Sequence, residues 1–215
     1  MKRSWIALGL VGLLACLAAC QPLLGKPATP DAARLLFKDD FSDPASGWVA
    51  STDRGASGGY ADGVYQLSIS QANLDLWATP GLDLADVRLE VEAIKIGGDR
   101  NNRFGLVCRM VDPAHYYVFL ISSDGYYGIG KIQANQARLL GSDSLLPSDK
   151  IPPGSAYLRL RAECVQDSLA LYVNGEKIYQ VRDSEYPHGD VGLTAGAYTS
   201  AGTQILFDNF SVAKP

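Results

Sequence analysis

The sequence predicts an all-β protein, built as an antiparallel β-sandwich of two sheets. From residue 35 onwards, most segments alternate apolar and polar residues with the period of two that is typical of half-buried strands. Turn formers such as Asp124-Gly125 and Asn174-Gly175 separate these segments. No stretch of a dozen residues shows the period of a helix, so we expect at most one short helix.

Residues 103–132 are the centre of this prediction, because they read as three consecutive strands joined by two tight turns. In the first strand we expect Leu106, Cys108 and Met110 to face the core. Asp112-Pro113 ends that strand, and Asp124-Gly125 separates the second strand from the third. Such a meander needs a second sheet to cover its apolar face, which the rest of the chain should supply.

The remaining segments give a total of about eleven expected strands. Further strands are expected at residues 64–70, 87–94, 157–165, 169–173, 177–181, 191–197 and 204–212. Asn174-Gly175 predicts a hairpin with a type I′ turn, since both residues tolerate a positive φ. Residues 139–153, with three prolines, are expected to form a loop.

Residues 1–19 have the features of an export signal. Lys2 and Arg3 precede an apolar stretch that is too short for a comfortable membrane span. The stretch ends in Leu17-Ala18-Ala19-Cys20, which resembles the lipobox of bacterial lipoproteins. We therefore expect removal of residues 1–19 and acylation of Cys20, which would place the protein in the cell envelope, on the extracytoplasmic side of a bacterial membrane. The alternative is an ordinary secretory signal that happens to contain a cysteine.

Residues 20–34 read as a tether, because Pro22, Pro27 and Pro30 interrupt both hydrophobic periods. In a polyproline form of ~3.1 Å per residue it would hold the following domain on the order of 40 Å from the membrane. Residues 35–215 are long enough for one β-sandwich domain with a sizeable core.

The charge of the chain argues against two classes of partner. The formal net charge is −4, and lysine and arginine do not cluster. Nucleic acids and anionic membrane surfaces both require a basic patch, so neither is an expected partner. Attachment to the membrane would then depend on the lipid at Cys20.

Several phrases of the sequence resemble a known family. They are DDFSDPASGW (39–48), DGVYQLSI (62–69), FGLVCRM, YYVFLISSDGYYGIGK, LYVNGEKI, DVGLTAG and LFDNFSV. Over residues 37–212 the chain is similar to the concanavalin A-like jelly-roll domains of bacterial lipoproteins, including the 3-keto-disaccharide hydrolase group. The resemblance implies a jelly-roll fold. It does not fix the function, because that superfamily contains lectins, adhesion modules and glycosidases.

Two motifs could indicate phosphate binding or catalysis, but each has a simpler interpretation. Residues 125–131, GYYGIGK, match the front of a phosphate-binding loop, but Ile132 replaces the metal-binding hydroxyl residue and a strand follows. Glu90 and Glu92 share one strand face, as the paired carboxylates of a glycosidase would. We favour a charged ladder in which Arg88, Glu90 and Glu92 pair with Arg159, Arg161 and Glu163.

Four aspartates raise the possibility of a structural calcium ion and no other cofactor. Asp39, Asp40 and Asp43 lie near the first strand and Asp208 near the last, so their oxygens would have to meet around the ion. Aspartates in such segments also form ordinary turns, which is the favoured interpretation. The two histidines are isolated, so no histidine-based metal or nucleophile site is predicted.

Cys108 and Cys164 both fall on the inward phase of their strands, in a chain expected in an oxidising compartment. A disulfide between them would stabilise the fold by ~3 to 5 kcal/mol in the chain-entropy model. Two buried thiols are the alternative.

An aromatic face is the candidate ligand site. Tyr117 and Phe119 fall on the face of their strand that should point away from the core. Tyr127 on the next strand and Arg109 on the preceding one extend that face. Aromatic rings beside a guanidinium suit a sugar, whose CH groups stack and whose hydroxyls form hydrogen bonds. The alternative is a patch covered by the loop at 139–153.

Two classes of function follow from these patterns. The first is a membrane-anchored, non-catalytic module that binds a glycan or another envelope component. The second is a glycoside-processing enzyme of the 3-keto-disaccharide hydrolase type. The lack of a convincing acid and base pair, together with the tether, favours the first.

Overall fold

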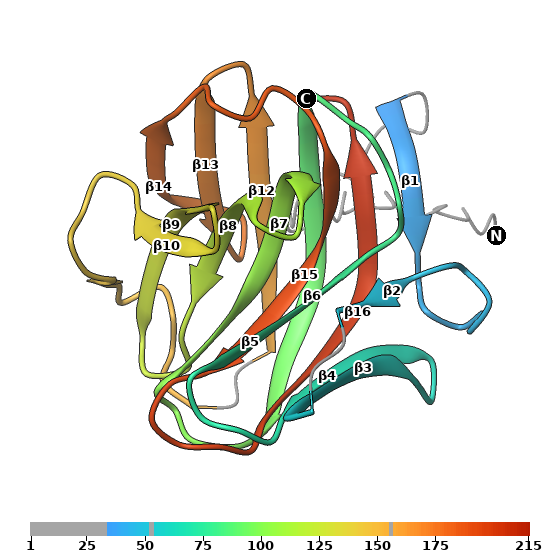
Figure 1. Cartoon of the computed structure of the whole chain (residues 1–215), viewed down its shortest axis with the longest axis vertical. Helices are drawn as coiled ribbons and strands as arrows, with labels where there is room; N and C mark the ends of the chain where they lie inside the picture. Colours follow the sequence, from blue (N-terminus) through green and yellow to red (C-terminus); the bar gives the residue numbers. More distant parts are fainter. Residues whose placement is uncertain (1–33, 52–53, 155–156) are drawn as a thin grey trace, which may run out of the picture.

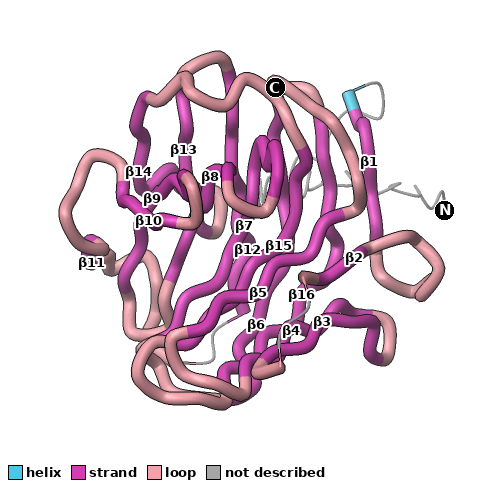
Figure 2. Tube along the Cα trace, in the orientation of Figure 1, coloured by secondary structure: helices cyan, strands magenta, loops and turns pink. Residues whose placement is uncertain are grey.

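The computed structural model describes residues 34–51, 54–154 and 157–215, and every extended element within them is a β-strand. The expected export signal, Cys20 and the tether up to residue 33 lie outside the described residues. Within the described ranges no helix is long and apolar enough to cross a membrane. Figure 2 shows that strands make up most of the described chain and that loops join them around its periphery.

The described residues contain sixteen strands. They are β1 (Leu35–Asp39), β2 (Val49–Ala50), β3 (Ala56–Ala61), β4 (Val64–Ile69), β5 (Leu74–Thr79), β6 (Val87–Gly97), β7 (Asn102–Asp112), β8 (His115–Ile121), β9 (Tyr126–Gln133), β10 (Gln136–Leu139), β11 (Leu146–Pro147), β12 (Tyr157–Val165), β13 (Ser168–Val173), β14 (Glu176–Arg182), β15 (Asp190–Ala197) and β16 (Thr203–Ala213).

These strands form two antiparallel sheets that enclose the core (Figure 1). Sheet A has the order β14-β13-β12-β6-β16-β4-β3, and β1 pairs with β16. Sheet B has the order β10-β9-β8-β7-β15-β5-β2, and β11 pairs with β9. In both sheets strands distant in sequence are neighbours, as β6 and β16 or β7 and β15 are. The predicted two-sheet antiparallel sandwich is confirmed.

Sheet A follows the predicted alternation closely. Side chains of β6 and β12 that point inward are buried, whereas their charged neighbours point outward. The outward groups pair across the two strands: Arg88 with Glu163 at 2.9 Å, Glu90 with Arg161 at 2.8 Å and Glu92 with Arg159 at 3.1 Å. The interpretation of Glu90 and Glu92 as members of a charged ladder is therefore confirmed.

The hairpin between β13 and β14 also forms as predicted. Asn174 has a φ of 51° and Gly175 a φ of 88°. Both central residues of a type I′ turn need such positive values, which asparagine and glycine accept at little cost.

A disulfide crosses the core. Cys108 of β7 and Cys164 of β12 are bonded, and neither residue is exposed to solvent. Because β7 belongs to sheet B and β12 to sheet A, the bond joins the two layers covalently. The predicted disulfide is confirmed.

Removing this disulfide should lower the free energy of unfolding without changing the strands. For the 56-residue separation between the cysteines, the chain-entropy model gives a loss of about 4 kcal/mol in the double variant Cys108→Ala/Cys164→Ala. Urea unfolding of the variant and of the oxidised protein measures the difference. Equal midpoints, or alkylatable thiols at both positions in the native protein, would contradict the assignment.

Candidate functional site

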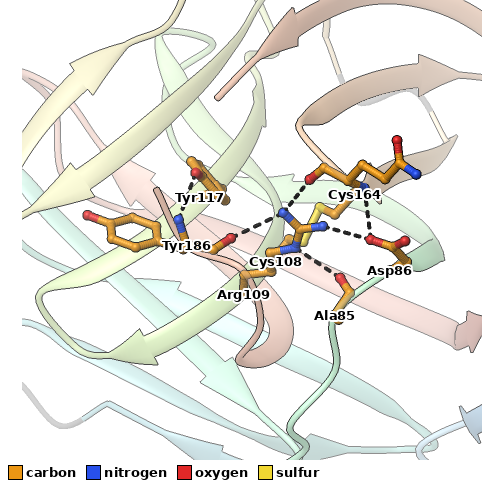
Figure 3. Close-up of a disulfide and its surroundings, with 8 residues drawn as sticks. Ala85, Asp86, Cys108, Arg109, Tyr117, Cys164 and Tyr186 are labelled. Carbon is orange, nitrogen blue, oxygen red and sulfur yellow. Dashed lines mark hydrogen bonds and ion pairs between the residues drawn. A yellow bond between two sulfur atoms is a disulfide. The ribbon is translucent and has the colours of Figure 1, made fainter. Parts of the chain in front are cut away.

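Arg109 lies inside the protein and not on an open face. It has a φ of 51°, at a point where the pairing of β7 with β8 shifts register, and it is 1% exposed. Its guanidinium donates hydrogen bonds to the carbonyl oxygens of Ala85, Gln166 and Tyr186 at 2.9, 2.8 and 3.1 Å, and pairs with Asp86 at 3.0 Å (Figure 3). Arg109 therefore fastens three loops together, and its expected role as a ligand contact is wrong.

Tyr117 and Phe119 are also interior residues. Phe119 pairs with Leu106 and Tyr117 with Cys108. Residues directly opposite each other in an antiparallel pair project to the same side of the sheet, so these four side chains share the core. Both aromatic rings are 0% exposed. The expectation that they point away from Leu106 and Cys108 is therefore wrong.

The Tyr117 hydroxyl is part of a closed polar network. It donates to Asp183 at 2.6 Å and accepts the Tyr186 amide at 3.1 Å. The Lys131 ammonium donates to Asp183 at 2.7 Å and to Glu185 at 2.6 Å. Burial, followed by the bond to Asp183, raises the pKa of Tyr117 to about 12. Lys131, the last residue of the GYYGIGK motif, thus lies on a strand and is paired with carboxylates.

Tyr127 is only partly buried. Its ring packs edge-on against Tyr179, with 5.4 Å between ring centroids, and burial raises the pKa of its hydroxyl. It pairs with Leu146 in the segment that was expected to form a covering loop. The four predicted residues therefore do not form an open platform, because three of them are enclosed.

The outer face of sheet B carries the alternate residues of the same strands. Val107, Met110, Tyr116 and Val118 form a small apolar cluster there, separate from the main core. Trp77, Leu120 and Ile132 pack against this cluster. Met110 belongs to it because the irregular pairing at Arg109 shifts the phase of β7, so its predicted place in the core is wrong.

A hollow of about 280 Å³ lies on this outer face, and we call it the outer hollow. Tyr116, Val118 and Leu120 of β8 line it. On one side it is bounded by residues of the β9 to β11 region, and on the other by residues of β5, β7 and β15. These bounding residues include Leu139, Leu145, Arg138, Asp75, Arg103, Thr194 and Tyr198.

A guanidinium held between a carboxylate and an aromatic ring forms the polar side of the outer hollow. Arg103 makes a two-pronged ion pair with Asp75, in which Nη2 lies 2.8 Å from Oδ2. The guanidinium carbon lies 4.1 Å from the ring centroid of Tyr198. Burial disfavours the charge of Arg103, but Asp75 and Tyr198 outweigh burial and raise its pKa.

Gly196 allows this ion pair to lie flat on the sheet. It sits between Arg103 and Asp75 in the strand order, paired with both. A Cβ at this position would collide with the Asp75 carboxylate and approach Arg103 Nε to 2.8 Å. A larger residue would therefore displace the pair.

Tyr116 supplies a second polar group to the outer hollow. The residue is 8% exposed, and burial, followed by the charge of Asp75, raises the pKa of its hydroxyl to about 12. Its hydroxyl has no hydrogen-bond partner among the described residues. At neutral pH it is therefore a protonated group able to bond a ligand.

The aspartates considered for calcium have other partners. Asp39 accepts hydrogen bonds from the Phe41 amide, Ser46 and the Trp48 indole, and Asp40 accepts them from Ser42. Within the part of the chain that the structure describes, no three acidic, histidine or cysteine side chains are grouped so as to hold a metal ion. Calcium stays a prediction without a ligand set.

Sequence reasoning missed Asp75, Arg103, Tyr116 and Tyr198. The signal for Tyr116 was its place directly before Tyr117, which we did assign, since successive residues of β8 alternate between the two faces. Asp75, Arg103 and Tyr198 come from segments whose adjacency depends on the order β5-β15-β7, which the sequence does not display.

Comparisons with known proteins place the fold. Neither a family model nor a curated protein matches the chain. Solved structures do: a carbohydrate binding module, CBM66, from Bacillus subtilis has a TM-score of 0.64 at 15% identity, covering 78% of this chain and 96% of that one. A Bacillus subtilis protein of unknown function with a galectin-like fold has a TM-score of 0.60 at 14% identity, covering 84% and 96%. The Emp47p carbohydrate recognition domain has a TM-score of 0.51 at 17% identity, covering 86% and 99%.

These likenesses define the class of protein by its fold. The chain has the antiparallel two-sheet jelly-roll fold of these structures, which is the fold that the resemblance of its sequence implied. At such low identities they establish the fold and leave the function to be argued from the site.

The bonds from Arg109 to three loops, which we call the Arg109 clamp, lead to a prediction about stability. Arg109→Met should lower the free energy of unfolding by about 3 to 5 kcal/mol, because three carbonyl oxygens, that of Tyr186 in a buried bond, lose the donor that joins their loops. Arg138→Met is the matched control, since this exposed arginine should change stability by less than about 0.5 kcal/mol. Urea unfolding compares the two, and equal stability of both variants with the native protein would show that the clamp is dispensable.

Proposed function

We propose that this protein is a glycan-binding module whose ligand lies in the outer hollow. One observation carries the proposal: the Arg103–Asp75 pair, stacked on Tyr198, borders the same hollow as Tyr116, whose hydroxyl has no partner within the described ranges. A sugar presents both CH faces and hydroxyls, and this hollow offers aromatic and aliphatic surface beside a donor and an acceptor.

The polar groups suit neighbouring sugar hydroxyls. The side chain of Asp75 is half exposed, so its carboxylate can accept a bond from a ligand while it stays paired with Arg103. The side chain of Arg103 is only 15% exposed, which fixes the pair before a ligand arrives. Fixed polar groups lose little conformational entropy on binding.

Solved structures of the same fold support the proposal. Two of those described above are named as a carbohydrate binding module and a carbohydrate recognition domain. The two glutamates considered as catalytic carboxylates are not part of the outer hollow, because Glu90 and Glu92 lie on the other sheet and are paired with arginines. A non-catalytic role is therefore part of the proposal.

Binding should depend on the two polar groups of the outer hollow. Screening the full chain on a glycan array identifies a ligand, whose affinity is then measured by calorimetry. We expect Tyr116→Phe to weaken binding about fivefold, the effect of one hydrogen bond. Arg103→Met should weaken it about tenfold or more, because it removes a charged donor and leaves Asp75 unpaired.

Arg159→Met is the matched control, because this arginine forms a similar ion pair on the outer face of sheet A. It should bind the ligand like the native protein. An array without any bound glycan, or equal affinities for all variants, would contradict the proposal. Cleavage of a bound oligosaccharide would instead favour the glycoside-processing alternative.

We also propose that the module is displayed on a membrane through a lipid at Cys20. The LAAC motif at residues 17–20 supports this proposal, as does the start of β1 at Leu35, directly after the proline-rich segment. The domain would then face ligands outside the membrane.

The substitution Cys20→Ala tests this anchor. It removes the sulfur to which the lipid would be attached, so the protein should move from the membrane fraction to the soluble fraction. Its circular dichroism spectrum should not change, because residue 20 is not part of the described strands, which begin at Leu35. Retention of the variant in the membrane fraction would count against lipidation.

A further inference from the structure

We propose a second binding site, for a single neutral sugar ring, at the edge of the sandwich. A cavity of about 480 Å³ opens there between β2, the last strand of sheet B, and β3, the last strand of sheet A. We call it the edge cavity. Its lining comprises Trp48, Val49, Ala50, Ser51, residues 56–59, Tyr60 and Tyr65. None of these residues carries a formal charge, which distinguishes the edge cavity from the outer hollow.

Tyr65 is the observation that points to a ligand. The residue is 1% exposed and lines the edge cavity, yet its hydroxyl has no hydrogen-bond partner among the described residues. Burial, followed by the proximity of Tyr60, raises its pKa to about 12, so the hydroxyl stays protonated. The Tyr65 hydroxyl oxygen is not among the enclosed polar atoms that lack a partner, so it is open to the edge cavity and can bond water or a ligand there.

The other polar atoms around the edge cavity are already engaged. The Trp48 indole donates to Asp39 at 2.8 Å, and the Tyr60 hydroxyl accepts the Trp48 amide at 3.0 Å and bonds Ser46 at 2.9 Å. These bonds hold both rings in place and leave them only carbon surface to offer a ligand. Tyr65 is therefore the one aromatic residue of the described lining whose polar atom remains available.

Two edge strands add backbone groups to this site. Among the described strands, β2 pairs only with β5, and β3 pairs only with β4. Each strand therefore leaves one row of amide and carbonyl groups without a partner in the sheet. Ring hydroxyls can bond such groups and the Tyr65 hydroxyl, while CH groups pack on Trp48 and Tyr60. A neutral sugar ring can make all three kinds of contact: with the backbone groups, with the Tyr65 hydroxyl and with the aromatic rings. A charged ligand would find no counter-ion in the lining.

Methyl glycosides of neutral hexoses are the probes for this site. We titrate them into the full chain and follow the amide resonances of Gly58 and Gly59, which lie in the lining. We expect these resonances to shift in the native protein. In Tyr65→Phe the apparent dissociation constant should rise about fivefold, and the melting temperature should stay the same or increase.

Tyr116→Phe is the matched variant, because it removes the same atom from the outer hollow. It should leave the Gly58 and Gly59 shifts unchanged, whether or not the outer hollow binds a glycan. The proposal is overturned if no methyl glycoside shifts these resonances, or if Tyr65→Phe binds as the native protein does. It is also overturned if Tyr65→Phe melts at a clearly lower temperature, because the hydroxyl would then be structural.

Discussion

The buried guanidinium of Arg109 is the constraint on which the organisation of the sandwich depends. A cation that is 1% exposed has to be compensated, and the carbonyl oxygens of three loops and Asp86 provide the compensation. One loop leads into β6, another joins β12 to β13, and the third joins β14 to β15. The neighbouring residue, Cys108, is bonded to Cys164 of the opposite sheet. Polar and covalent links at adjacent positions of β7 thus hold both layers together (Figure 3).

The same constraint determines the face used for the outer hollow. Arg109 adopts a positive φ where β7 and β8 lose register, so Val107 and Met110, three residues apart, join one outer cluster. Strict alternation would have placed them on opposite faces. The irregularity lets β7 turn Arg109 and Cys108 toward the interior and still contribute apolar surface outside. The packing of the interior and the surface of the proposed ligand site therefore both depend on one local feature of the backbone.

The sequence was informative where a strand is buried on one face only. For β6 and β12, alternation identified the inward residues and the ion pairs of the outward ones, and Asn174-Gly175 identified its turn. For β7 to β9 both faces are largely buried, so apolar residues occur at most positions. The alternation therefore does not show which residues point toward the core. That ambiguity put Tyr117 on the wrong side. Strands of two residues, such as β2 and β11, have no period to detect, and Arg103 meets Asp75 only through the order of the sheet.

Four buried tyrosines among the described residues divide into two kinds, according to whether the hydroxyl has a partner within the protein. Tyr117 and Tyr186 have hydroxyls bonded within the protein, to Asp183 and to the carbonyl oxygen of Ile132. Tyr65 and Tyr116 have hydroxyls without a partner in the described residues, and each lines a cavity. Neither hydroxyl oxygen is enclosed, so each can bond water when no ligand is present. In the proposed sites, these two hydroxyls are the groups that a ligand would meet, whereas those of Tyr117 and Tyr186 hold the fold together.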